Sequence, residues 1–103
     1  MSIFNFGDGP VPAHKHPNGG GWVADTASVA TTAYVGPNAQ VYGNARVYDS
    51  ALVYGNARVY DSALVYDSAL VYDSALVSGD ALVYDTARVY GNARVSGNAQ
   101  RPA

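Results

Sequence analysis

A six-residue repeat runs without interruption from Val23 to Gln100 and constrains the fold of this chain more than any other feature. The thirteen repeats are, in order, VADTAS, VATTAY, VGPNAQ, VYGNAR, VYDSAL, VYGNAR, three copies of VYDSAL, VSGDAL, VYDTAR, VYGNAR and VSGNAQ. Every repeat has Val at its first position and Ala at its fifth. A repeat of fixed length is typical of a solenoid, in which each unit stacks on its neighbours. The repeats cover 78 of the 103 residues, so we expect a single domain.

Each repeat predicts a short β-strand followed by a corner. In residues 63–66 (Ala-Leu-Val-Tyr), alternation places Ala and Val on one side of a strand and Leu and Tyr on the other. The next two residues, Asp67 and Ser68, are typical of turns, as are the Gly-Asn pairs of other repeats. A helix is excluded, because six is not a helical period and turn residues recur in every repeat.

The repeats VYGNAR and VYDSAL, each followed by Val, resemble those of the hexapeptide-repeat, left-handed parallel β-helix family, and the resemblance covers the whole of 23–100. They are most similar to the Asn/Tyr-rich hexapeptide proteins of bacteria and their phages. The resemblance implies an all-β triangular prism with three repeats per coil, and hence about four and one-third coils (78/18). It also implies left-handed coiling, against the usual right-handed rule for parallel strands.

The two ends of the prism are expected to differ. Residues 1–22 have no period and predict an N-terminal cap over the Val column, with apolar side chains at Ile3, Phe4, Phe6, Val11 and Trp22. Only a short tail, 101–103, follows the last repeat. We therefore expect the level of Val95 and Ala99 to remain partly open and to allow end-to-end contact between molecules.

Stacking of residues eighteen apart sorts the outward side chains into three faces. Face A, mostly polar, carries Gln40, Arg58, Leu76 and Arg94 beside Tyr42, Tyr60, Ser78 and Ser96. Face B carries Arg46, Leu64, Leu82 and Gln100 beside Tyr48, Tyr66 and Tyr84. Face C carries Tyr34, Leu52, Leu70 and Arg88 beside Gly36, Tyr54, Tyr72 and Tyr90.

The apolar parts of faces B and C predict an interface between copies of this chain. Contiguous apolar surface usually marks an interface, although exposed Tyr ladders alone need no partner. Leu is neither a favoured strand residue nor a polar one, so the Leu side chains on these faces favour an interface over a solvent-exposed surface. Two different apolar faces suit a closed ring, so we expect a trimer before a two-fold dimer. The predicted interface residues are Leu52, Leu64, Leu70, Leu82, Tyr48, Tyr54, Tyr66, Tyr72, Tyr84 and Tyr90.

Catalysis is not expected, and no catalytic or cofactor-binding residue is assigned. Many hexapeptide-repeat proteins resembling this one are acyltransferases that use a His on a loop protruding from the coil, and γ-class carbonic anhydrases bind zinc with three His. Here the repeats are contiguous, and the only histidines, His14 and His16, precede them. Alternate positions on a strand would place both imidazoles on one side, but a metal site needs more ligands. We expect solvated histidines in a polar cap.

Two other features of the sequence have some of the residues of a binding site but not the whole pattern. Asp49, Asp67 and Asp85 are expected to stack in one corner, where a cation such as Ca²⁺ would relieve their repulsion. Exposed corners are well screened, so no metal is assigned. The Gly-rich segment 17–21 lacks a phosphate-loop pattern and is expected to be a turn.

Composition limits partners and location. Six Lys/Arg against eight Asp/Glu, spread along the chain, provide no basic groove for nucleic acid, and no stretch is long and apolar enough for a membrane span. The first residues do not have the pattern of a signal peptide. We expect location in the cytoplasm or in a phage particle. The absence of Cys excludes disulfides.

These observations favour a non-catalytic, self-assembling β-solenoid module that acts as an assembly element or display stalk. One alternative is a trimeric acyltransferase-like enzyme with His14 or His16 at a subunit boundary. Another is an engineered or repeat-expanded scaffold, since residues 59–76 contain three identical repeats.

Overall fold

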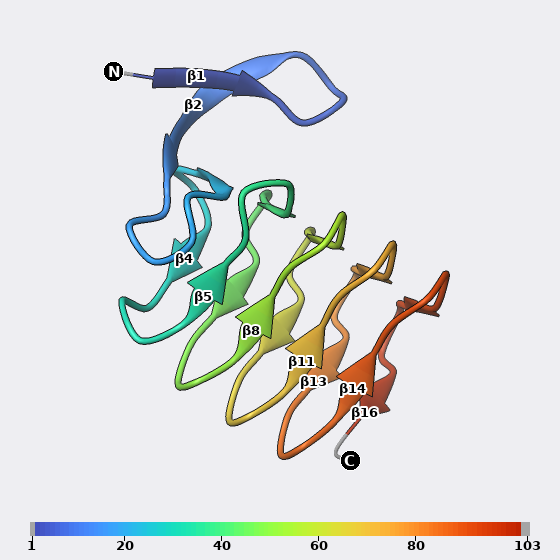
Figure 1. The fold of residues 1–103 in the computed structure, drawn as a ribbon. Helices are drawn as coiled ribbons and strands as arrows, with labels where there is room; N and C mark the ends of the chain where they lie inside the picture. The colour runs from blue at the N-terminus through green and yellow to red at the C-terminus, as the bar shows by residue number, and fades with distance from the viewer. Residues whose placement is uncertain (1, 102–103) are drawn as a thin grey trace.

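The computed structural model describes residues 2–101 and shows a β-solenoid of about four coils with an N-terminal hairpin above it (Figure 1). The prediction of an all-β fold built from stacked parallel coils is confirmed. Within 2–101 there is no helix, and so none that could span a membrane. The molecule measures 37 × 25 × 20 Å along its principal axes.

Each repeat contributes one very short strand, formed by its last residue and the residue that follows, which is the Val of the next repeat except after the last repeat, where it is Arg101. Three parallel sheets result, one behind each face. The sheet of face A contains β3 (Trp22–Ala24), β6 (Gln40–Val41), β9 (Arg58–Val59), β12 (Leu76–Val77) and β15 (Arg94–Val95). The sheet of face B contains β4 (Ser28–Val29), β7 (Arg46–Val47), β10 (Leu64–Val65), β13 (Leu82–Val83) and β16 (Gln100–Arg101). The sheet of face C contains β5 (Tyr34–Val35), β8 (Leu52–Val53), β11 (Leu70–Val71) and β14 (Arg88–Val89).

The register of every parallel pair is eighteen residues. Leu64 pairs with Leu82, for example, and Val65 with Val83. The assignment of outward side chains to the three faces is therefore confirmed. Backbone bonds also join the corners, where Ser68 N–H donates to the Asp85 carbonyl at 2.9 Å. Consecutive coils are thus bonded along both strands and corners.

The core is a column of Val with Ala at the approach to each corner. Twelve of the thirteen repeat Val side chains are no more than 1 % exposed, and Val29 alone is partly buried. At the C-terminal end Val95 is 1 % exposed, so the expectation that its level is open is wrong for Val95, while Ala99 is partly exposed as expected. The narrow prism leaves room inside only for these small side chains, which explains their invariance.

Two kinds of corner occur. From the fourth repeat onward every third-position residue has positive φ: 58–60° at Asp49, Asp61, Asp67, Asp73 and Asp85, and 60–66° at Gly43, Gly55, Gly79, Gly91 and Gly97. In the first three repeats the third-position residues are Asp25, Thr31 and Pro37, and none has positive φ. Pro cannot adopt positive φ and β-branched Thr strongly avoids it, so the first coil turns differently.

The N-terminal segment extends the sheet of face A instead of lying over the Val column. β1 (Ser2–Asn5) and β2 (Pro10–Lys15) form an antiparallel hairpin, and β2 pairs antiparallel with β3. Ile3 and Val11 are 59 % and 40 % exposed, so the expectation that they cover the core is wrong. Phe4, Phe6 and Trp22 pack outside face A instead.

The segment 16–21 covers the top of face C. Gly21 N–H donates to the Val35 carbonyl, and Val35 N–H donates to the Asn18 carbonyl. The buried His16 lies in this segment. The edge strand β4 of face B has no such cover among the described residues, which accounts for the partial exposure of Val29.

Candidate functional site: the Leu and Tyr faces

The Tyr side chains of faces B and C form stacked ladders, one ring per coil. On face B, the Tyr48 and Tyr66 centroids are 4.9 Å apart and those of Tyr66 and Tyr84 5.3 Å apart. On face C, Tyr54 stacks on Tyr72 at 5.0 Å, and Tyr72 on Tyr90 at 5.5 Å. These spacings follow the ~4.8 Å separation of parallel strands, so the backbone sets the stacking.

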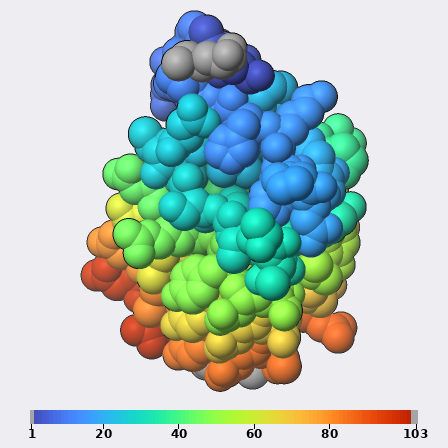
Figure 2. Space-filling model, turned by 90° about the vertical axis from the view of Figure 1, so that its left-hand side faces the viewer, coloured from blue at the N-terminus to red at the C-terminus, as the bar shows by residue number. Residues whose placement is uncertain are grey.

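Stacking leaves these faces half-buried within a single chain. Leu52, Leu64, Leu70 and Leu82 are each half-buried, and of the predicted interface residues only Tyr90 is mainly exposed, at 56 %. The structure thus brings the ten residues together as two contiguous apolar surfaces, with less exposed area than the sequence alone suggests. Figure 2 shows the coils as closely stacked layers between the blue N-terminal segment and the orange to red C-terminal coils.

Burial within the ladders changes the acidity of three tyrosines. Burial is the main cause that raises the pKa of Tyr42, Tyr48 and Tyr66 above the ordinary 10.0. The carboxylate of Asp49 adds to the rise at Tyr48, and the guanidinium of Arg58 opposes it at Tyr42. All three rings therefore stay neutral and able to stack at neutral pH.

The corner carboxylates hold the coils together. The Asp49 Oδ2 atom accepts a hydrogen bond from Asp67 N–H at 3.1 Å, and Asp67 Oδ2 accepts one from Asp85 N–H at 3.0 Å. Asp61 and Asp73 accept bonds from Gly79 and Gly91 in the same way. Each of these four carboxylates thus accepts a hydrogen bond from a backbone donor one coil further on. Within residues 2–101 no group of three His, Cys, Asp or Glu side chains could hold a metal ion.

The two histidines lie in different environments. His16 is 3 % exposed, and its Nε2 atom is 2.8 Å from the Ala33 carbonyl oxygen. The expectation that it is solvated is therefore wrong. His14 is about half-exposed, and its Nδ1 atom lies 2.8 Å from Asp25 Oδ1. Sequence reasoning missed this pair, because the antiparallel β2–β3 register that joins them is not part of the repeat.

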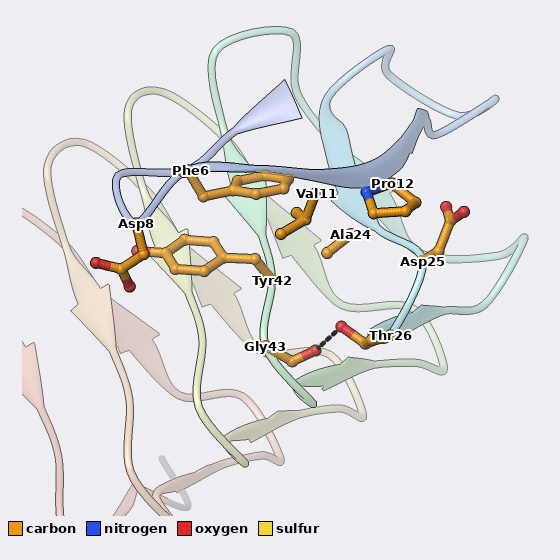
Figure 3. A pocket seen from close by; sticks show the side chains of 10 residues that line it. Phe6, Asp8, Val11, Pro12, Ala24, Asp25, Thr26, Tyr42 and Gly43 are labelled. Carbon is orange, nitrogen blue, oxygen red and sulfur yellow. Dashed lines mark hydrogen bonds between the residues drawn. The ribbon is translucent and has the colours of Figure 1, made fainter. Parts of the chain in front are cut away.

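A pocket of about 340 Å³ lies between the hairpin and the first coil (Figure 3). Its apolar lining includes Phe6, Val11, Pro12 and Tyr42, with Asp25 at its edge. The Phe6 ring stacks on Tyr42 at 4.8 Å. Sequence reasoning did not find this pocket either, since it is formed by the non-repeating segment.

Comparison with known families supports the repeat architecture. A family model described as the YdcK beta solenoid repeat matches residues 39–54, 51–67 and 87–101. The chain is similar to that repeat over these segments, all of which lie in the solenoid. No curated protein and no solved structure matches the chain.

Proposed function

We propose that this β-solenoid repeat protein is a non-catalytic module that self-associates through faces B and C. The observation that carries the proposal is the pair of contiguous Leu/Tyr surfaces on faces B and C, whereas face A has a single Leu, Leu76, and one stacked Tyr pair, Tyr42 and Tyr60, among polar and charged side chains. Face B of one copy packs on face C of the next, and three copies close a ring. Such a ring would serve as an assembly element or display stalk in a bacterial or phage protein.

Light scattering at micromolar concentration tests the proposal, with three matched variants. The intact chain is expected at about three times its 10.7 kDa mass. Leu64→Lys on face B and Leu70→Lys on face C are each expected to give monomers, because either change places a charge in the same heterologous contact. Leu76→Lys, at the same repeat position on face A, serves as the control and is expected to leave the mass unchanged.

The outcomes distinguish the two modes of association. If only one of the two face variants dissociates the assembly, a two-fold dimer through that face replaces the ring. An intact chain of 10.7 kDa contradicts self-association altogether. Circular dichroism of each variant establishes that it is folded.

The finer family assignment is part of the proposal. The six-residue period, the three sheets and the eighteen-residue register support hexapeptide coiling, and the resemblance to the hexapeptide-repeat family implies the left hand. An electron-density map of the crystallised protein gives the hand directly, and right-handed coils would contradict the assignment.

The exposed His14–Asp25 pair favours one second candidate, acyl transfer. A carboxylate bonded to an imidazole orients a general base, and Asp25 lies at the edge of the pocket in Figure 3. Acyl transfer from a thioester to an amine, lost in His14→Gln and retained in Lys15→Gln, would support it. No turnover above the uncatalysed rate would leave the structural module as the function.

A further inference from the structure

The three aromatic columns begin differently in the first coil. On face A the second position is Ala24, which has no ring, but Phe6 from the hairpin supplies one. Its ring stacks on Tyr42 with centroids 4.8 Å apart and an angle of 18° between the planes. The column is thus continued upward by a ring from outside the repeat.

Face C fills the equivalent position in another way. A Cβ atom at Gly36 would lie 3.4 Å from Cε2 of Tyr34 and 3.1 Å from Cβ of Tyr54. An edge of the Tyr34 ring therefore borders the space that a side chain at Gly36 would enter.

Face B has no bulky side chain at this level. Its first-coil residues are Ser28 and Ala30, and a hollow of about 430 Å³ opens there, bordered also by Arg46, Tyr48 and Leu64. Among the described residues Tyr48 stacks only on Tyr66, so the other side of its ring belongs to the hollow. Backbone bonds from Ser28 to Ala45 and from Ala30 to Val47 fix the floor, at 3.0 and 2.9 Å. The backbone below the hollow is therefore held by the same bonds that join the coils.

The charge beside the hollow is positive. Arg46 is exposed and has no carboxylate of the described residues within 4.0 Å. The closest acidic residue in sequence, Asp49, directs its Oδ2 atom to Asp67 N–H in the next coil. A guanidinium that lacks an internal partner is suited to a carboxylate, and Ser28 adds a hydroxyl donor.

We propose that this hollow binds a small planar aromatic anion, with the ring stacked on Tyr48 and the anionic group bonded to Arg46 and Ser28. Phe6 on Tyr42 is the precedent within the same molecule for the stacking. The offset-stacked geometry and the apolar edge of Leu64 select an aromatic ring, and Arg46 selects the negative charge. The site shares Tyr48 and Leu64 with face B, so the self-association proposed above would compete with ligand binding, and the titration below is also run on the Leu70→Lys variant, in which face B is unchanged.

Nuclear magnetic resonance titration of the intact chain with three probes tests the site. Benzoate is expected to shift the Tyr48 ring and Ala30 signals in a saturable manner, with a Kd on the order of a millimolar. Cyclohexanecarboxylate keeps the charge without the ring, and benzylamine keeps the ring and reverses the charge. Both are expected to bind at least about tenfold more weakly. Equal binding of all three probes, or no saturable shift with benzoate, overturns the proposal.

Variants locate the binding. Ala30→Tyr places the protein's own ring in the hollow and is expected to abolish benzoate binding while the fold is kept. Ser78→Tyr, at the same repeat position on face A, is expected to leave the Kd unchanged. Arg46→Gln is expected to raise the Kd about fivefold to tenfold, and Arg94→Gln on face A to leave it unchanged. Retained binding in Ala30→Tyr would contradict the site. Because light scattering reads self-association separately, failure of one proposal is distinguishable from failure of the other.

Discussion

The first coil, residues 23–40, and the coils below it make equivalent contacts by different chemical means. In the lower coils a fourth-position backbone N–H donates to the third-position carbonyl one coil further on, as Ser50 does to Asp67 at 3.0 Å. In the first coil the corners lack positive φ, and the side-chain hydroxyls of Thr26 and Thr32 make the equivalent bonds to Gly43 and Asp49. The difference teaches that two local conformations can provide the bond between the corners of consecutive coils.

The first coil and the lower coils also differ in what covers them. The lower coils cover one another with identical Val and Ala, whereas the first coil depends on individual residues from the N-terminal segment. Phe6 covers Tyr42, and the turn containing His16 covers the edge of β5. The comparison predicts that substitutions in the lower coils act on the whole solenoid and that those near the first coil act locally.

The largest effect is expected at the middle of the Val column. Val65→Asp places an unpaired charge between two coils at a fully buried site, and we expect a loss of more than about 4 kcal/mol in the free energy of unfolding. Val29→Asp, in the first coil, is expected to cost less because Val29 is partly exposed. Urea unfolding followed by circular dichroism measures both, and equal losses would break the proposed distinction between the regions.

Substitution of the two histidines of the N-terminal segment is expected to have an intermediate effect on the free energy of unfolding. His16→Ala removes the buried bond to the Ala33 carbonyl and leaves that acceptor with fewer donors, which should cost about 1–3 kcal/mol. His14→Ala removes only a half-exposed pair with Asp25, so about 0–1 kcal/mol is expected. Thermal unfolding gives both values. A greater loss of stability from His14→Ala than from His16→Ala would contradict the larger contribution assigned to the buried His16 bond.

A smaller effect is expected at the corners of the lower coils. Asp67→Ala keeps positive φ without a carboxylate and loses the 3.0 Å bond to Asp85 N–H, so we expect destabilisation of about 1–2 kcal/mol. Asp67→Gly loses the same bond but relieves the backbone, and should be closer to the original stability. Chemical denaturation of both variants separates the contribution of the hydrogen bond from that of the positive φ. Identical stabilities of the two variants would mean that positive φ has no energetic cost at this position.

The smallest effect is expected in alkaline solution. The pKa values of Tyr42, Tyr48 and Tyr66 are raised in the folded chain, so above pH 10 the unfolded chain ionises first. Their contribution to stability is therefore present below about pH 10 and declines as pH rises through the folded pKa values. Absorbance titration at high pH should show late-ionising tyrosines in the folded chain, and Tyr66→Phe should remove one of them. Simultaneous titration of all tyrosines near pH 10 would contradict the prediction.

The sequence predicted the periodic part of the fold because one constraint repeats in every unit. Val at the first position and Ala at the fifth define the inside, and the eighteen-residue stacking then places Leu64 over Leu82 and Tyr48 over Tyr66. The candidate interface could therefore be assembled residue by residue. Even the corner role of Asp was recognisable as turn chemistry, although its bond to the next coil was not.

The N-terminal segment could not be predicted in the same way. Its strands pair antiparallel, so its contacts do not follow the register of eighteen. The burial of His16, the exposure of Ile3 and the His14–Asp25 pair all depend on that pairing. The apolar character of this segment predicted a cover over the Val column, whereas in the structure the Phe6 ring stacks on Tyr42 outside face A.

The eighteen-residue register has a consequence for how this chain can change in length. Loss of one repeat between Leu64 and Leu82 would preserve the Val column but rotate all later side chains onto the neighbouring face, so these two residues would no longer pair. Loss or gain of three repeats would keep the phase and change only the height. Only insertions or deletions of whole coils therefore keep the same kinds of side chain together on each face.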